Sequence, residues 1–234
     1  MQIFYAPDIK SDKYILDRKE SRHCVRVMRM RKGDSVRLID GMGNLYEGII
    51  SEADPEKCCV EIKHVIHGFE KRDYSLHIAI SPLKNPDRFE WFIEKSVELG
   101  TDEITPLICR NTEKLGVKPE RISNLIISAM KQSLRAKITK LNPPAEFSSF
   151  IREEMKGKLL IAHCNNNLER SSIGEVYRKG EDSVILIGPE GDFSNDEIIA
   201  AETRGYRSVH LGSGRLRTET AGIAACHSIY FINQ

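Results

Sequence analysis

From Leu76 onward the chain alternates short apolar strands with amphipathic helical stretches, and this alternation limits the possible fold more than any other feature. The stretches 158–163 and 183–187 have only apolar residues at their centres. Such runs are typical of parallel strands buried on both faces. Further strands are expected over 76–81, 103–108 and 207–211, and helices over 86–100, 121–134, 194–204 and 218–232.

Two of these helices carry start signals. Asn85 precedes Pro86, and an Asn before a Pro at the first helical position is a typical N-cap. Ser194 followed three residues later by Glu197 forms a capping box. Because strands and helices alternate throughout this region, we predict an α/β domain with a mainly parallel sheet covered by helices on both faces.

The first 70 residues have a different pattern, with short β-rich segments at 3–5, 35–39, 45–53 and 58–66. The turn at 40–44 contains two glycines and is typical of a hairpin. One helical stretch, 19–30, interrupts the strands, and its Val25 and Met28 are expected to face the core. We therefore predict a small β-barrel domain over 1–70, a linker at about 71–75, and the α/β domain over 76–234.

Charge is unevenly distributed along the chain. The net charge is only +1, which excludes a generic polyanion binder. A local basic cluster nevertheless lies within 18–37: Arg18, Lys19, Arg22, Arg26, Arg29, Arg31, Lys32 and Arg37. Such a cluster is able to neutralise several phosphates of a nucleic acid, and a solvated helix face is the alternative interpretation.

The cysteines give no indication of a disulfide framework or a metal site. All six are scattered, none forms a C-x-x-C pair, and none has a His at zinc spacing. No segment near either end is apolar enough for a signal peptide or a membrane span. The sequence therefore predicts reduced thiols, no metal, no membrane partner and a cytoplasmic location.

Two glycine-rich turns directly follow predicted strands, at 188–192 (Gly-Pro-Glu-Gly-Asp) and 212–217 (Gly-Ser-Gly-Arg-Leu-Arg). Ligands of open α/β sheets bind at the carboxyl ends of the strands, and small residues let the backbone approach a planar base. Ordinary strand-to-helix connections are the alternative. A dinucleotide site is disfavoured because Arg217 replaces the third glycine, and no phosphate-binding G-x-x-x-x-G-K-[ST] motif is present.

The start of the last predicted helix is rich in polar groups. Arg217, Thr218, Glu219 and Thr220 place a cation, an anion and two hydroxyls beside the second glycine turn. The free N–H groups of a helix start favour anionic partners. Simple capping of the helix by Thr218 is the alternative interpretation.

Four blocks of residues resemble the RsmE family of ribosomal RNA methyltransferases. The first is 23–30 with Gly33 and Asp34, and the second is Lys84 and Glu90 with 94–100. The third is Gln132, Ser133 and Arg135, and the fourth is 186–191 with 211–212 and 216–221 (Leu-Arg-Thr-Glu-Thr-Ala). The resemblance therefore extends over nearly the whole chain and does not depend on one motif.

This resemblance implies an enzyme of the SPOUT class that uses S-adenosylmethionine to methylate N3 of one uridine in 16S ribosomal RNA. It implies a PUA-like RNA-binding barrel, a trefoil-knotted C-terminal domain, and a homodimer that acts on 16S ribosomal RNA or the 30S subunit. The residues it assigns to the cofactor are Ile187, Gly188, Glu190, Gly191, Leu211, Gly212, Leu216, Thr218, Thr220 and Ala221. Candidate RNA contacts are Arg22, Arg26 and Arg29 from the basic cluster, together with Lys84, Arg110, Gln132 and Arg135.

Three residues depart from the family's pattern. Asp192 stands where a second glycine is usual, and Gly214 and Arg215 stand where a polar residue and an Ile are usual. These changes concern the detailed contacts of the two turns more than the backbone-lined pocket. The turn Asn165, Asn166 and Asn167 matches a loop that varies in the family, and a plain polar turn is its alternative interpretation.

The chemistry implied for this site requires loss of the proton on uridine N3. We expect Arg217 to stabilise the anionic base electrostatically, and Glu219 to position Arg217 or to take the proton. Two alternatives stay open: a SPOUT methyltransferase that acts at another RNA position, and a non-catalytic RNA-binding factor in ribosome assembly.

Overall fold

The structure is a computed structural model that describes residues 3–113 and 116–234. The chain forms two compact units, one from the residues up to Lys71 together with Ile127–Ile138, and one from Arg72–Ile126 together with Thr139–Gln234. Helix α3 (Pro119–Gln132) begins in the second unit, and its residues from Ile127 belong to the first. The domain boundaries expected from the sequence, 1–70 and 76–234, stay a prediction, because a compact unit need not fold independently.

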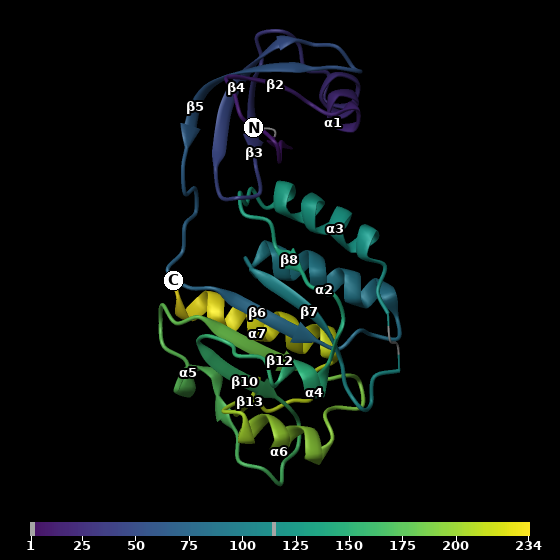
Figure 1. Cartoon of the computed structure of the whole chain (residues 1–234), viewed down its shortest axis with the longest axis vertical. Helices are drawn as coiled ribbons and strands as arrows, with labels where there is room; N and C mark the ends of the chain where they lie inside the picture. Colours follow the sequence, from purple (N-terminus) through teal and green to yellow (C-terminus); the bar gives the residue numbers. More distant parts are fainter. Residues whose placement is uncertain (1–2, 114–115) are drawn as a thin grey trace. The chain divides into compact units, whose positions relative to one another are not determined.

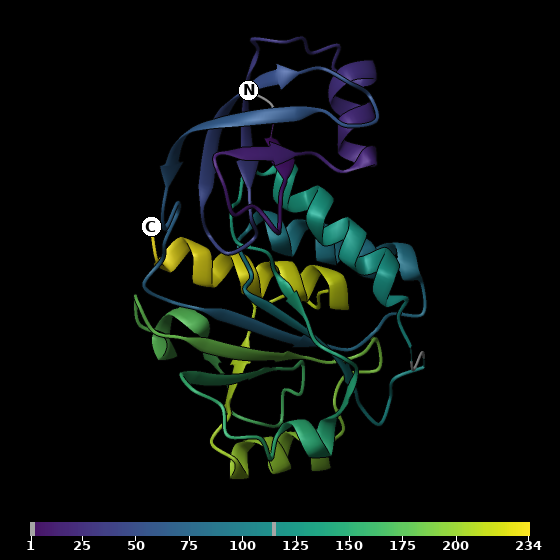
Figure 2. The same cartoon turned by 45° about the horizontal axis from the view of Figure 1, so that its top comes forward.

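The first unit is a curled sheet (Figures 1 and 2) in the strand order β1-β3-β4-β5-β2. Its strands are β1 (Ile3–Tyr5), β2 (Lys13–Ile15), β3 (Ser35–Ile39), β4 (Leu45–Glu52) and β5 (Cys59–Ile66). Only β1 and β3 pair in parallel; the other neighbours are antiparallel. Its core includes Phe4, Leu38, Ile50 and Val60, all fully buried. Sequence reasoning did not anticipate β2, a short edge strand with exposed ends.

The helix expected over 19–30 is divided in two. An α-helical turn, α1 (Arg18–Arg22), passes directly into a π-helical turn, η1 (His23–Val27). Because the wider π-turn rotates the side chains relative to an α-helix, Cys24 is the residue that becomes fully buried. The expectation that Met28 faces the core is wrong, since its side chain is 41% exposed, whereas Val25 packs partly against the core.

The second unit is an α/β layer structure. In the described residues, eight strands form a parallel sheet with the path β11-β13-β10-β12-β6-β7-β8, and β9 pairs with β7. The strands are β6 (Leu76–Ile80), β7 (Glu103–Ile108), β8 (Lys140–Leu141), β9 (Ala145–Glu146), β10 (Lys158–Ala162), β11 (Ser171–Ser172), β12 (Ser183–Ile187) and β13 (Arg207–His210). The remaining helices are α2 (Pro86–Glu98), α4 (Phe147–Phe150), α5 (Ile173–Val176), α6 (Asn195–Thr203) and α7 (Thr218–Ile232).

Helices cover both faces of this sheet, as expected. Figure 2 shows α7 on one side of the strands and α6 on the other. Alternate residues of one strand point to opposite faces, and accordingly Ala79 belongs to the core cluster under α4 and α6, whereas Ile80 lies against α7. The predicted caps are confirmed: Asn85 accepts from Asp87 N, and Ser194 forms its capping box with Glu197.

Several features expected from the sequence concern the chain as a whole. The six cysteines are free thiols, four of them buried. No helix in the part of the chain that the structure describes is long and apolar enough to cross a membrane. The trefoil knot implied by the family resemblance stays a prediction.

Candidate active site

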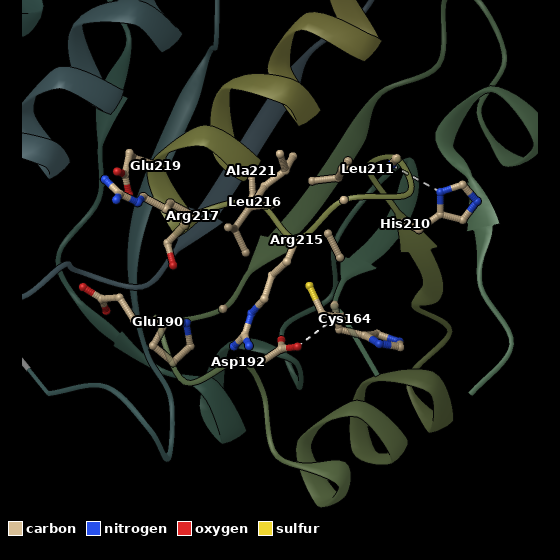
Figure 3. Close-up of a pocket in the computed structure, with 18 of the residues that line it drawn as sticks. Cys164, Glu190, Asp192, His210, Leu211, Arg215, Leu216, Arg217, Glu219 and Ala221 are labelled. Carbon is tan, nitrogen blue, oxygen red and sulfur yellow. Dashed lines mark hydrogen bonds between the residues drawn. The ribbon is translucent and has the colours of Figure 1, made fainter. Parts of the chain in front are cut away.

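A pocket of about 640 Å³ lies in the second unit at the carboxyl ends of three adjacent strands, β13, β10 and β12 (Figure 3). The chain order of these strands differs from their order in the sheet, which brings together the loops that follow Ala162, Ile187 and His210. Both glycine-rich turns line this pocket. The carboxyl edge of a parallel sheet is the usual place for a ligand in this architecture.

Most of the residues assigned to the cofactor line the pocket. Those that do are Ile187, Gly188, Glu190, Leu211, Gly212, Leu216, Thr218 and Ala221, together with the two candidate catalytic residues Arg217 and Glu219. Gly191 and Thr220 are not among its lining residues. Gly191 instead faces Asn111, whose Cβ would lie 3.2 Å from a Cβ at this position.

The first glycine turn is tightly packed. A Cβ on Gly188 would come within 3.1 Å of the Phe193 ring and 3.2 Å of the Phe193 backbone nitrogen, so only glycine fits without a shift. Glu190 accepts a hydrogen bond of 3.2 Å from the backbone N–H of Lys84. The turn is therefore held both by the strand it follows and by the loop after β6.

The backbone conformation and hydrogen bonds of Asp192 explain why Asp is able to stand where the family usually has glycine. Its φ of 62° lies in the left-handed region that favours glycine and that Asp also tolerates. Its carboxylate accepts from the backbone N–H of Phe193 and of Cys164, both at 2.8 Å, and the second of these bonds ties the turn to the loop after β10. Asn111 Nδ2 donates to the carbonyl of Asp192 at 3.0 Å. The side chain thus joins two of the loops that form the pocket.

The second glycine turn is open. A Cβ at Gly212 or Gly214 would meet no atom within 4 Å, and Gly212 has a φ of 122°. The backbone N–H of Gly212 donates to His210 Nδ1 at 3.4 Å (Figure 3). Arg215 is exposed, and in Figure 3 its side chain points across the pocket toward Asp192. All three residues that depart from the family's pattern thus line the same cavity.

The start of α7 differs from simple capping by Thr218. Arg217 is the N-cap residue and makes no side-chain capping bond, while Thr218 is the first helical residue and is buried. Glu219 is also buried, at 7% exposure, in the first turn of the helix. Its ion pair is with Arg88 from α2, with Arg88 Nε 3.8 Å from Glu219 Oε1; among the described residues no such pair joins it to Arg217.

Sequence reasoning missed several pocket residues, most of which lie far from the two turns in sequence. These are Arg88, Ala162, His163, Cys164, Arg170 and His210. His163 is 4% exposed, and burial lowers the pKa of its imidazole, which favours the neutral form. Its Nδ1 accepts from Asn165 N at 3.2 Å, while its Nε2 has no partner within the described part of the chain. Asn166 of the polar turn lines the pocket as well. Strand order brings the residues after β10 to the turns, and the packing of α2 on α7 brings Arg88, so no local motif could have identified them.

The candidate RNA contacts fall in both units. Lys84 pairs with Glu113 at 2.9 Å, which raises the pKa of the lysine, and Arg110 lies 3.5 Å from Asp196. Gln132 and Arg135 belong to the first unit. Of the basic cluster, Arg22 is 2.7 Å from Glu56. Arg26 and Arg29 are exposed and form no ion pair with another residue that the structure describes.

No metal site is found among residues 3–113 and 116–234, because no three His, Cys, Asp or Glu side chains gather closely enough to hold an ion. The pocket is lined by glycine turns, four arginines, the acids Glu190, Asp192 and Glu219, and the histidines His163 and His210. This set suits binding of a polar organic ligand and stabilisation of negative charge.

Comparisons with known proteins agree with this architecture. Residues 70–230 match the family model described as RNA methyltransferase domain, and residues 16–63 match the RNA methyltransferase PUA domain. The chain is 30% identical over 208 residues to a ribosomal RNA small subunit methyltransferase E of Rickettsia conorii, and the match covers 85% of this chain and 81% of that protein.

Solved structures extend the likeness over the whole chain. A probable rRNA-methyltransferase from Porphyromonas gingivalis is 38% identical with a TM-score of 0.92, covering 100% of this chain and 98% of the other. A ribosomal RNA small subunit methyltransferase E from Neisseria gonorrhoeae, bound to S-adenosyl methionine, is 26% identical with a TM-score of 0.89, covering 99% and 98%. Because sequence and fold agree over both units, this chain belongs to the ribosomal RNA small subunit methyltransferase E family.

Proposed function

We propose that this protein transfers the methyl group of S-adenosylmethionine to N3 of a uridine in 16S ribosomal RNA. The observation that carries the proposal is the pocket where both glycine turns meet Arg217 and Glu219. Its 640 Å³ falls within the range of small-molecule sites. The names of the relatives support the ribosomal RNA substrate, and the family resemblance supports the uridine N3 atom.

The pocket suits the cofactor in two respects. A Cβ at Gly212 or Gly214 would meet no atom within 4 Å, so the backbone of the second turn borders open space and is able to approach an adenosine closely. Two solved neighbours, from Neisseria gonorrhoeae and Legionella pneumophila, contain S-adenosylmethionine. Bound here, it supplies an activated methyl group on a positively charged sulfur. The residues we assign to this binding are those of the two turns that line the pocket, from Ile187 to Glu190 and from Leu211 to Leu216.

The remaining task of the site is to prepare the acceptor. Uridine N3 loses its proton, gains the bond to the methyl carbon, and the sulfur keeps the electron pair of the broken S–C bond. We assign Glu219 as the group that takes the proton, and Arg217 as the cation that stabilises the negative charge developing on the base. The pocket must also hold donor and acceptor in line near contact distance, which lowers the barrier through orientation.

Further proposals concern the RNA substrate, the location and the assembly state. We propose that Arg26 and Arg29 contact RNA phosphates, that the 30S subunit or 16S ribosomal RNA is bound, and that the reaction takes place in the cytoplasm. A homodimer is proposed as well. It is supported by the family resemblance, and we expect Phe231 of α7 at the interface, where its ring is 70% exposed and stacks on His227 with a centroid distance of 6.0 Å.

Mass spectrometry of ribosomal RNA tests the proposal. RNA from a strain that lacks the gene should lack N3-methyluridine at one position, and purified protein with S-adenosylmethionine should restore it. Arg217→Ala should bind the cofactor in calorimetry but fail to restore the modification. A modification that persists without the gene would overturn the assignment of N3. Cofactor binding with methylation elsewhere would indicate another RNA position, and no binding would indicate a non-catalytic factor.

A further inference from the structure

Helices α2 and α7 approach each other unusually closely in the second unit. A Cβ at Gly222 would lie 2.6 and 2.7 Å from two ring carbons of Phe92 and 2.9 Å from Ile80 Cδ1. Phe92 and Ile80 are both fully buried, so neither is free to swing away. Glycine at position 222 is therefore required for this helix contact, even though it weakens the helix intrinsically.

The same contact continues one turn toward the start of each helix. Arg88 lies four residues before Phe92 on α2, and Glu219 lies three residues before Gly222 on α7. Residues at these spacings share a helix face. The close approach that Gly222 allows thus brings Arg88 to Glu219, where their nearest nitrogen and oxygen are 3.8 Å apart.

Glu219 is nearly shielded from water, whereas Arg88 is partly exposed. The Glu219 side chain is 9% exposed, whereas that of Arg88 is 44% exposed. Both line the pocket that contains the second glycine turn. A carboxylate with so little access to water requires a partner of opposite charge or a hydrogen-bond donor. At 3.8 Å the Arg88 guanidinium is an ion-pair partner and not a hydrogen-bond donor, so it draws the carboxylate toward α2 by electrostatic attraction.

We propose that Arg88 is a positioning residue that holds the Glu219 carboxylate toward the reacting base. This inference rests on the proposed function, in which Glu219 takes the N3 proton. Arg88 itself touches neither the donor nor the methyl group in this assignment. Its contribution is to stop the carboxylate from turning away and to offset its charge during the part of the cycle in which no RNA is bound.

Steady-state methylation of a 16S ribosomal RNA fragment tests the proposal with five variants. Arg88→Gln should lower kcat about tenfold, a change of about 1.4 kcal/mol in barrier, with the cofactor Kd and the Tm close to those of the wild type. Arg88→Lys should recover part of the rate, since it restores the charge. The double variant Arg88→Gln with Glu219→Gln should be no slower than Glu219→Gln alone. Arg121→Gln is the matched control, because Arg121 pairs with Glu90 of α2 at 2.6 Å, outside this pocket.

The outcomes separate this inference from the proposed function. A wild-type kcat in Arg88→Gln, or a rate loss that simply adds to that of Glu219→Gln, would overturn the positioning role while wild-type methylation of N3 still stood. A loss confined to Tm or to cofactor affinity would also overturn it, since it would mean that Arg88 only supports the fold. If the wild-type protein shows no transfer to N3, the proposed function itself fails.

Discussion

Replacing Asp192 by Gly should destabilise the folded protein, although Gly suits the backbone better at this position. The φ of 62° costs a residue with a Cβ roughly 1 kcal/mol, and less for Asp. Against this gain, the carboxylate accepts two hydrogen bonds of 2.8 Å, from Phe193 N and Cys164 N. Bonds to a charged acceptor are worth about 1.5–3 kcal/mol each, and the lower value applies because Cys164 is exposed to water. The net loss should be about 2 kcal/mol.

Three variants separate the two effects. Asp192→Asn keeps one acceptor oxygen and tolerates the backbone, so it should lose least. Asp192→Ala loses both bonds and stays strained, so it should be about 1 kcal/mol less stable than Asp192→Gly. Urea unfolding followed by fluorescence and circular dichroism measures these differences, and the Tm of Asp192→Gly should fall by roughly 4–8 °C.

Two results would refute this reasoning. An Asp192→Gly protein as stable as the wild type would show that the carboxylate bonds contribute nothing net. Equal stability of the Gly and Ala variants would show that the left-handed backbone imposes no cost. The first result would mean that the link Asp192 makes between the turn after β12 and the loop after β10 does not stabilise the pocket.

Three further predictions concern the rest of the molecule. The double variant Arg26→Ala with Arg29→Ala should weaken RNA binding and leave cofactor affinity unchanged, and the slope of log Kd against log salt should fall by about 0.7–0.9 for each phosphate that is no longer neutralised. Arg22→Ala should have a smaller effect because Glu56 already pairs with Arg22. An unchanged slope would exclude these side chains from the RNA interface. Lys131→Met should lower the free energy of unfolding, measured in urea, by about 3 kcal/mol, because it leaves the buried Glu20 without the ammonium group that lies 2.5 Å from its carboxylate. A decrease of less than about 1 kcal/mol would contradict this prediction. Burial lowers the pKa of His77 and of His163, so below about pH 6.5 the unfolded chain binds protons that the folded protein does not. The free energy of unfolding should therefore fall as the pH drops below about 6.5. A free energy of unfolding that stays constant between about pH 7 and 5 would contradict this prediction.

The local features of this fold could be read from the sequence because each depends on residues that are close along the chain. Asn85 caps α2 and Ser194 with Glu197 caps α6, as predicted, since a cap involves only three or four neighbouring residues. The strands β3, β7 and β12 begin and end at the residues expected from the sequence. The position of the glycine turns after β12 and β13 followed from the same local signals, and so did the motif blocks that resemble the family.

Local signals failed where the backbone leaves the regular α-helix. A continuous helical period was expected over 19–30, but the π-turn after Arg22 buries Cys24 and exposes Met28. The hydrogen bond from Met28 N to His23 O that defines this turn spans five residues, one more than in an α-helix. Residue pattern alone does not distinguish the two, because both expose charged side chains.

Tertiary structure alone decided which residues share the pocket. His163 joins the glycine turns because β10 lies between β12 and β13 in the sheet, although it precedes both in the chain. Arg88 reaches Glu219 because Gly222 lets two helices that lie more than a hundred residues apart in sequence come into contact. Strand order and the packing of large side chains decide which residues become neighbours. Both are properties of the whole folded chain, so no periodic pattern in a short stretch of sequence indicates them.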